Sequence, residues 1–438
     1  MNQVNPNQQI HSKTVRAQIV HWFLVFFGYR GIPKLARPTF RNEFFGQLCS
    51  NIGGGLLVVQ LLQLIYLDIF KVSSDYAPFI ATISMIGMAA GSFIGKHLST
   101  RPKIPYIVGA RLGVAALLII ASMLPISSTG AFCLTLLLVV GFILQSLVIN
   151  VQSRIWQSNY PPAVRGKIVG KLMVFKIIFL GLASQFASQI LTINPNSMHI
   201  VLAGAGVCFL LSAKFYSRIR IRRERSAIAH NKTHKVGFLS QFSILKHDKY
   251  FAKYMLLQML SGMCVMSLQG VLIPVFKARF ESSIALAALI TILNRSIFQV
   301  IFSPIAGNIF DRIGTMRFRS INTSLWASSI AIVGIGFWQY SLALVIVGYS
   351  VMGIAQATGG VVWNIGHTRF APRGKGQIYM GVHQSLTGAR GLVMPLLGYY
   401  IFQSVAGLGL MLTAAVVQFG VSAAFFFSKE PTLADHDD

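Results

Sequence analysis

Charged residues are scarce in this chain of 438 residues. Only 11% of the side chains are Asp, Glu, Lys or Arg, whereas 54% are hydrophobic and the mean hydropathy is +0.63. A water-soluble domain usually carries about a quarter charged residues, so this chain has too little polar surface for a soluble globule. The composition predicts an integral membrane protein.

Acidic residues are especially few, with 11 Asp and Glu against 38 Lys and Arg. A net charge of +27 is also found in nucleic-acid-binding proteins. Here, however, the basic residues stand between apolar runs, which is the pattern of membrane topology signals. We therefore expect the lipid bilayer as a partner and no nucleic acid.

Motifs for metals and cofactors are missing as well. The cysteines Cys49, Cys133, Cys208 and Cys264 lie in apolar stretches without the spacing of a zinc site or a redox pair, so we interpret them as packing residues. The sequence has no Gly, four residues, Gly-Lys-Ser/Thr loop for a nucleotide, which argues against direct use of ATP. We expect no cofactor and no bound metal.

Long apolar runs dominate what is present. A hydrocarbon core of about 30 Å requires about 20 residues of helix. Twelve such runs lie at about 44–69, 77–98, 104–126, 130–153, 166–191, 197–217, 250–275, 283–310, 318–338, 341–366, 376–402 and 406–428. Their length and their lack of strict alternation favour helices over the strands of a membrane barrel. The sequence predicts an all-α fold with 12 transmembrane helices.

Lys and Arg residues are distributed very unevenly around these spans. Of the 38, 31 lie in the first tail, in every second connection or after the last span, three lie in the opposite connections, and four lie inside spans. Cytoplasmic connections carry the excess of basic residues in membrane proteins. We therefore predict a multi-pass protein of the plasma (cytoplasmic or inner) membrane with both termini cytoplasmic.

The chain divides into two similar halves. A basic cytoplasmic linker at 218–249 separates a first six-helix bundle, 43–217, from a second, 250–428. Short sequences recur between the halves, since Pro162 and Gly166 match Pro372 and Gly376 at an offset of 210. Further matches are Phe70-Lys71 with Phe276-Lys277, and Ala90-Gly91 with Ala306-Gly307. The same order in both halves predicts one six-helix unit that occurs twice in the same orientation.

Two terminal segments flank these bundles. Residues 1–42 form a cytoplasmic N-terminal segment, which is either an amphipathic helix on the membrane surface or a partly ordered tail. Residues 429–438 form an acidic cytoplasmic tail.

The connection after the eighth span carries a recognisable motif. It reads Gly307, three residues, Asp311-Arg312, one residue, Gly314, followed by basic residues. This resembles the loop signature of the major facilitator superfamily, and the helix count, the repeat and the basic linker resemble the same family. The resemblance implies secondary active transport by two bundles that rock about a central cavity. It also implies that Gly307, Asp311 and Arg312 take part in gating at the inner face.

Charges inside the predicted spans are candidates for function, because each costs about 2.5–3.5 kcal/mol to insert. Arg295 and Arg390 lie near mid-membrane, and Lys176 lies in the inner half of the fifth span. The resemblance places helices 5, 8 and 11 around the cavity. Arg111 is expected to reach the lipid headgroups instead. No acidic residue is expected deep in a span, since residues such as Glu43 stand near span ends.

Three cations without a carboxylate partner indicate an anionic substrate, because guanidinium groups pair well with carboxylates and phosphates. A polycarboxylate, a carboxylate siderophore or a phosphorylated metabolite fits this chemistry. Asn294, Gln269 and Asn364 are candidate polar contacts, although such residues also serve as interhelical hydrogen bonds. His383 lies on the same helical face as Arg390 and is the candidate for proton or ion coupling.

Two other classes of function stay open at this point. A transporter-like membrane sensor would bind a solute without moving it. A membrane-embedded lipid enzyme would need catalytic side chains at one depth, and the lack of deep carboxylates argues against any enzyme. The direction of transport, the coupling ion and the oligomeric state are not encoded in these patterns.

The predicted orientation is testable by cysteine labelling. Single cysteines at Ser226 and Ser240, in a background without the native cysteines, are expected to be protected from membrane-impermeant maleimide in intact cells. Both positions lie in the linker that the basic residues place in the cytoplasm. Labelling from outside would overturn the orientation.

Overall fold

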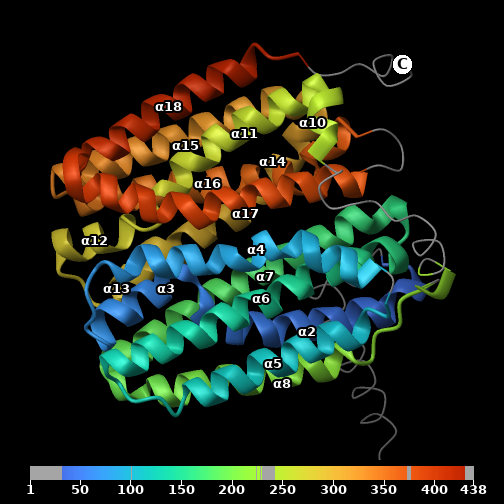
Figure 1. The fold of residues 1–438 in the computed structure, drawn as a ribbon, viewed down its shortest axis with the longest axis horizontal. Coiled ribbons are helices and arrows are strands. Elements are labelled where there is room, and N and C mark those ends of the chain that lie inside the picture. The colour runs from blue at the N-terminus through green and yellow to red at the C-terminus, as the bar shows by residue number, and fades with distance from the viewer. Residues whose placement is uncertain are drawn as a thin grey trace, which may run out of the picture.

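A computed structural model describes residues 32–99, 101–222, 224–226, 228, 242–371 and 376–429. These residues form helices joined by short connections, with no strand among them. The helices form two groups, α2 to α8 and α11 to α18, which lie side by side (Figure 1). The predicted N-terminal segment up to residue 31 and the tail from residue 430 lie outside the described residues.

The first bundle runs from residue 34 to residue 216. Its helices are η1 (Lys34–Ala36), α2 (Arg37–Gly54), η2 (Gly55–Leu57), α3 (Val59–Leu64), η3 (Ile65–Ile69), α4 (Tyr76–Ser99), α5 (Ile104–Ala121), α6 (Ser128–Asn159), α7 (Pro162–Ile193), η4 (Pro195–Ser197) and α8 (Met198–Tyr216).

The second bundle begins after the short helix α10 (Ile244–His247). Its helices are α11 (Lys249–Ser267), α12 (Leu272–Phe280), α13 (Ile284–Ala288), η6 (Leu289–Asn294), α14 (Arg295–Ile313), α15 (Thr315–Trp338), α16 (Leu342–Ile365), η7 (Gly366–Arg369), α17 (Gly376–Ile401), η8 (Phe402–Ala406) and α18 (Gly409–Phe426).

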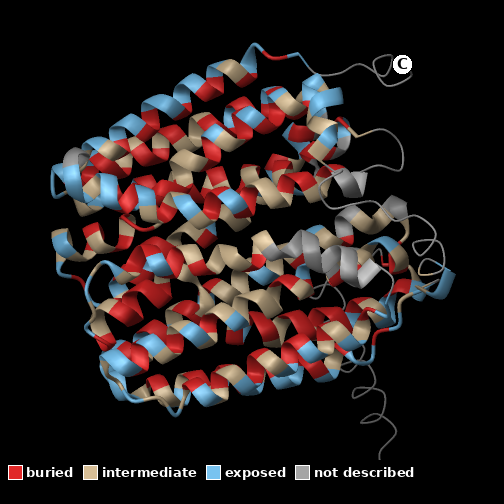
Figure 2. Cartoon of the chain, in the orientation of Figure 1, coloured by how far each residue is buried: buried red, intermediate tan, exposed pale blue. Residues whose placement is uncertain are grey.

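The predicted all-α membrane fold is confirmed. Among the described residues, ten helical segments are long and apolar enough to cross a membrane. The other two predicted spans, 77–98 and 376–402, coincide with α4 and α17, which are 24 and 26 residues long. Many exposed side chains on the outer helix faces are Leu, Ile, Val or Phe, as expected for a surface that faces lipid (Figure 2).

Three predicted spans are not the single straight helices that hydropathy alone suggests. The first is broken at Val58, whose ψ of 127° is extended, and its helix begins at Arg37 rather than near residue 44. The seventh is interrupted between Ser267 and Leu272, and the eighth contains the π-helical turn η6. Hydropathy depends on side-chain polarity and therefore does not reveal such breaks. A break leaves backbone N–H and C=O groups without their helical partners, and this is tolerated at membrane depth where the protein itself surrounds them.

One end of the molecule gathers the connections that carry most basic residues. The Asn159 side chain, between α6 and α7, contacts the backbone of Arg220 and Arg222 in the linker at 2.8 and 3.0 Å. Lys103, between α4 and α5, pairs with Glu224 of the linker at 3.8 Å. We call this the linker end and the opposite end the far end.

Hydrogen bonds join the two bundles at the far end. The Gln63 side chain donates to the backbone oxygen of Gln269 at 2.8 Å, and these two residues are related by the repeat offset of 206. Tyr399 of α17 donates to Asp75 at 2.9 Å. Lys277 forms an ion pair with Asp68 across the interface at 2.9 Å.

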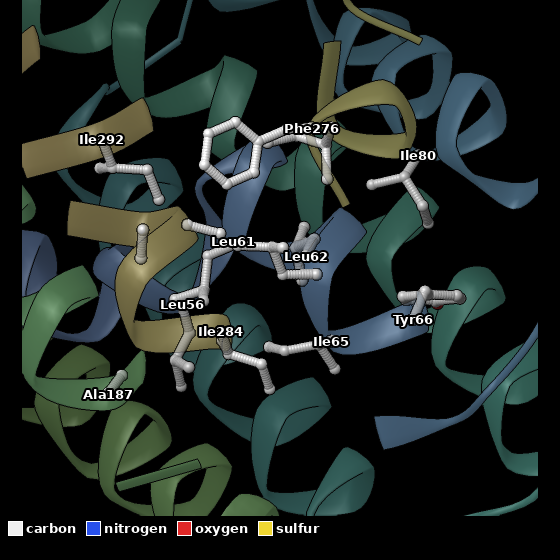
Figure 3. Close-up of a cluster of buried hydrophobic side chains, with 14 of the residues drawn as sticks. Leu56, Leu61, Leu62, Ile65, Tyr66, Ile80, Ala187, Phe276, Ile284 and Ile292 are labelled. Atoms are coloured by element: carbon white, nitrogen blue, oxygen red, sulfur yellow. The ribbon is translucent and has the colours of Figure 1, made fainter. Parts of the chain in front are cut away.

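An apolar cluster surrounds these polar contacts. It brings Leu61 and Ile65 of the first bundle together with Phe276, Ile284 and Ile292 of the second (Figure 3). These side chains are 5% exposed or less. The interface between the two bundles, which we call the seam, continues along α4 and α17. These helices are in close contact there, because a Cβ at Gly388 of α17 would lie only 2.5 Å from the Cα of Ala89 in α4. Small residues permit such close helix contact in membranes.

The ion pair between Asp68 and Lys277 is expected to favour this closed far end. Asp68→Lys should shift the distance between spin labels at Ser73 and Glu281, measured by pulsed electron resonance, toward longer values. A partly exposed pair contributes about 0.2–1 kcal/mol, which limits the population shift to about fivefold. The double variant Asp68→Lys with Lys277→Asp should restore the original distances. Identical distributions in wild type and the single variant would remove the pair from the closing mechanism.

Candidate functional site

A narrow space between α2 and α7 in the first bundle, which we call the α2–α7 cavity, is nearly filled by its lining side chains in this structure. Gln47 and Asn51 are buried in its wall, with 5% and 8% of their surfaces exposed, and Lys176 is an exposed residue beside them. The full lining is Phe44, Gln47, Leu48, Asn51, Leu172, Phe175, Lys176 and Phe179. Apolar walls with a few convergent polar groups are typical of sites for small molecules.

Helical periodicity explains this lining. Gln47 and Asn51 are four residues apart on α2, and Phe175 and Phe179 are four residues apart on α7, so each pair presents one helix face. Sequence reasoning identified Lys176 because a charge in an apolar run is conspicuous. It did not place Gln47 in the site, and the only available signal was its helical spacing from Asn51.

A second, small cavity lies elsewhere in the first bundle and is lined by α5, α6 and Leu57. All of its lining residues are apolar or glycine. It offers no group that would orient a polar ligand.

Arg295, whose neighbour Ser296 contacts α7, begins α14 and packs against α16. Its side chain is half-buried, its guanidinium lies near Tyr349 of α16, and its Nε has no hydrogen-bond partner among the described residues. The neighbouring Asn294 donates to the Ile346 backbone at 3.1 Å and to Ser350 at 3.2 Å. Asn294 therefore joins helices of one bundle and holds the start of α14 in place.

Lys176 and Arg295 lie on α7 and α14, two helices from different bundles that contact each other. A Cβ at Gly181 of α7 would lie 3.1 Å from the Cβ of Ser296, so the two helices touch at this level. Lys176 lies five residues, about 7.5 Å of helical rise, from Gly181 toward the linker end. The structure thus brings the helices of these two predicted residues together.

Arg390 points elsewhere. Its Nη1 donates to the backbone oxygen of Gln258 in α11, and its guanidinium lies against Gly262, which has no side chain in the way. Arg390 is 7% exposed and is held inside its own bundle. Its predicted part in a site shared with Lys176 stays a prediction without a contact to support it.

The other predicted polar residues are also dispersed. Gln269 lies at the far-end seam, where its backbone oxygen accepts from Gln63. Asn364 is exposed and donates to the Gly360 oxygen of its own helix at 2.7 Å. His383 is fully buried in the second bundle, 5.7 Å from the ring of Trp363. None of these three lines the α2–α7 cavity.

Two arginines differ from their predicted environments. Arg319, which hydropathy placed in a connection, lies in α15 and is 5% exposed. Arg111, expected to reach lipid headgroups, is also 5% exposed, with its guanidinium 5.4 Å from the Phe209 ring. Hydropathy indicates how deep a residue lies along a span. It does not show whether a neighbouring helix covers the face of the helix on which that residue lies.

The sequence places Glu43 near the end of a span, but in the structure neighbouring helices enclose its carboxylate. It is fully buried and accepts hydrogen bonds from Trp156 Nε1 at 2.5 Å, Tyr160 Oη at 2.5 Å and Gln47 Nε2 at 3.2 Å. Because α2 begins at Arg37, residue 43 lies about two helical turns into the helix, rather than just before its predicted start. Gln47 links this carboxylate to the wall of the cavity.

Comparison with known proteins identifies the family. Residues 44–294, more than half of the chain, match the sequence profile described as Major Facilitator Superfamily. The chain belongs to the Major Facilitator Superfamily. No curated protein matches this superfamily member in sequence.

Solved structures agree with this assignment at the level of the fold. The inward-open conformation of the xylose transporter XylE from E. coli has a TM-score of 0.69 at 11% identity, covering 91% of this chain and 97% of that one. A mutant of the nucleoside transporter NupG gives 0.68 at 14% identity, covering 89% and 100%. A POT family transporter in complex with a thioalcohol-conjugated peptide gives 0.67 at 15% identity, covering 90% and 97%.

The family-like motif of this superfamily member lies where α14 meets α15. Gly314 has a φ of 82°, a conformation that side chains rarely adopt, so glycine suits this sharp connection. Gly307 lies in α14 with open space beside it, and Arg312 is exposed. The Asp311 side chain lies outside the described part of the chain, so its gating role stays a prediction.

The hydrogen bonds of Glu43 are expected to stabilise the folded protein. Glu43→Gln should lower the free energy of unfolding by about 1–3 kcal/mol, because an amide replaces a charged acceptor opposite the indole and phenol donors. Thermal unfolding of the purified protein measures this loss. Glu281→Gln, at an exposed far-end position, should leave the melting temperature unchanged. Equal melting temperatures for both variants would contradict a stabilising role for Glu43.

Proposed function

We propose that this protein is a secondary active transporter that moves a small organic anion across the membrane by alternating access. One observation carries the proposal: the α2–α7 cavity offers the Lys176 ammonium, the amides of Gln47 and Asn51, and aromatic walls. Its lining has no carboxylate. An anionic group would pair with the ammonium, and the amide groups would hydrogen-bond the remaining oxygens.

Arg295 supplies the contact from the second bundle. It belongs to the helix that touches α7 at Gly181, and its Nε has no partner among the described residues. A ligand that reaches both Lys176 and Arg295 contacts both bundles. Such a ligand favours the state in which the bundles close around it, because it binds that state more tightly than the open ones.

The anion class is argued from this chemistry and not from the neighbours. The similar structures belong to transporters of xylose, of nucleosides and of peptides, and at 11–15% identity they share the fold alone. Polycarboxylates, carboxylate siderophores and phosphorylated metabolites carry the planar or tetrahedral oxygen groups that Arg and Lys bind.

The structure corresponds to one state of the proposed cycle. Its far end is closed by the Gln63 contact and the apolar cluster, and XylE in an inward-open conformation is among the similar structures. With the linker end in the cytoplasm of an inner membrane, as the basic residues favour, this state faces inward.

Proton coupling is better placed at Glu43 than at His383. Gln47 donates a hydrogen bond to Glu43 and also lines the cavity. Protonation of the Glu43 carboxylate would therefore change the hydrogen bonding of a side chain at the ligand site. His383 is buried in the second bundle, away from this cavity. We therefore propose coupling at Glu43, while the role of His383 stays a prediction from helical spacing.

Transport by variants in proteoliposomes tests the proposal. A thermal-shift screen against anionic metabolites first identifies the ligand, because binding raises the apparent stability. Lys176→Gln and Arg295→Gln should each raise the KM for that anion by about tenfold, the loss of one charge-assisted hydrogen bond. Arg295→Lys, which keeps the charge and loses the planar fork, should lose less.

The matched control is Lys171→Gln, which removes a cation from the same helix outside the cavity lining. It should transport with the wild-type KM. Wild-type kinetics in both Lys176→Gln and Arg295→Gln would refute the anion site. Saturable binding without any flux in wild-type vesicles would favour a sensor over a transporter.

A further inference from the structure

Four basic side chains lie together inside the second bundle, apart from the α2–α7 cavity. Arg319 comes from α15, His367 from η7, and His383 and Arg390 from one face of α17. Their exposed fractions are 5%, 5%, 0% and 7%. The rings of His367 and His383 are 6.4 Å apart, and both arginines donate to Gln258. We call these residues the cationic cluster.

The cationic cluster has only neutral partners among the described residues. Arg319 donates to Asn322 Oδ1 at 2.9 Å and to Gln258 Oε1, and Arg390 donates to the Gln258 backbone oxygen. Both guanidiniums therefore converge on one glutamine of α11. In the part of the chain that the structure describes, the ion pairs are Lys103–Glu224 and Lys277–Asp68, and neither involves the cluster.

Several polar atoms of the cluster and its surroundings have no hydrogen-bond partner among the residues that the structure describes. They are the Nε atoms of Arg319 and Arg390, both ring nitrogens of His383, Nδ1 of His367, Tyr254 Oη and Thr387 Oγ1. Tyr254 and Thr387 lie on α11 and α17, the helices that also carry Gln258 and Arg390. Buried polar groups are nearly always paired, so this concentration indicates an occupant that accepts hydrogen bonds.

The related arginine of the first bundle, Arg111, has a different charge environment. Arg111 precedes Arg319 by 208 residues, within the range of the repeat offsets, and it also bonds to a glutamine, Gln145, at 3.2 Å. Its guanidinium lies 5.6 Å from the Tyr216 ring, and Tyr216 packs against Gly46 of α2, beside the buried Glu43. The first bundle thus encloses one cation and one carboxylate. The second bundle instead encloses Arg390 as well as Arg319, and neither forms an ion pair among the described residues.

The physical cost of this arrangement is large. An ionised group that is buried without a counter-charge loses several kcal/mol of hydration, and two guanidiniums also repel each other. A guanidinium group does not avoid this cost by losing its proton, because it is too strong a base to be deprotonated in proteins. Neutral amide oxygens of Gln258 and Asn322 offset only part of this cost.

We propose that the cationic cluster binds a small inorganic anion, of the chloride class, between the guanidiniums of Arg319 and Arg390 and the imidazole of His383. The enclosed position favours a monatomic ion over an organic solute, since no member of the cluster is more than 7% exposed. The anion neutralises the interior of the second bundle and ties α11, α15 and α17 together. This role is independent of which solute the protein transports.

Chloride-dependent stability tests the proposal. The melting temperature of the purified protein is measured in potassium chloride and in potassium gluconate at equal ionic strength. Wild type should be several degrees more stable in chloride, with a saturable dose dependence, because a ligand that binds only the folded state stabilises it. Arg319→Gln should lose this difference.

Arg111→Gln is the matched control, because it removes the repeat-related arginine from the bundle that has its own carboxylate. It should keep the full chloride effect, whatever its absolute stability. Equal melting temperatures of wild type in the two salts would overturn the proposal. So would an equal loss of the chloride effect in both variants, because the response would then not depend specifically on the cationic cluster.

Gln258→Glu provides a second test that does not depend on a destabilised variant. Its carboxylate would stand between the two guanidiniums and replace the anion. This variant should match or exceed wild-type stability in gluconate and should no longer respond to chloride. A wild-type chloride response in this variant would place the anion elsewhere.

Bromide gives a direct readout with the wild-type protein. Crystals grown in bromide should show an anomalous peak within hydrogen-bonding distance of Arg319 and Arg390. Density in that position that is not anomalous, or no density there at a bromide concentration that saturates the stability effect, would exclude the site. These outcomes are separate from the transport assays, which probe Lys176 and Arg295.

Discussion

The cost of placing charge in a low-dielectric interior shapes much of this structure. Each enclosed charge is compensated differently. Glu43 receives three hydrogen bonds from donors on two helices, and Arg111 lies against aromatic rings. Lys176 stands beside a cavity, and two arginines share Gln258. The proposed functions follow from the charges whose compensation is incomplete, because those groups gain most from a ligand.

Movement between the bundles depends on a seam that is mostly apolar. The apolar cluster around Leu61 and Phe276 supplies hydrophobic contact in this seam. Because hydrophobic contact is not directional, the two bundles can separate and come together again at this surface. A few polar contacts, such as Gln63 with Gln269, define its register. Helix breaks at Val58 and between α11 and α12 lie on the two helices that meet there. The far end therefore combines a reversible interface with helices that are already interrupted.

The two bundles share one plan but differ in charge. Arg111 and Arg319 occupy related positions, and each bonds to a glutamine. Among the described residues, the first bundle adds a buried carboxylate, whereas the second adds a second buried arginine and two buried histidines. This difference in charge is the basis of the anion site that we propose in the second bundle.

Sequence alone determined the membrane class, the all-α fold and the family, because hydropathy, basic connections and the motif after the eighth span are properties of local segments. It also selected Lys176, since one charge in an apolar run stands out. Tertiary structure decided which way charges face. Arg390 turns into its own bundle and Glu43 becomes enclosed, because neighbouring helices fix the covered faces. Arg319 joins Arg390 only through Gln258, a contact between three helices that no linear spacing encodes.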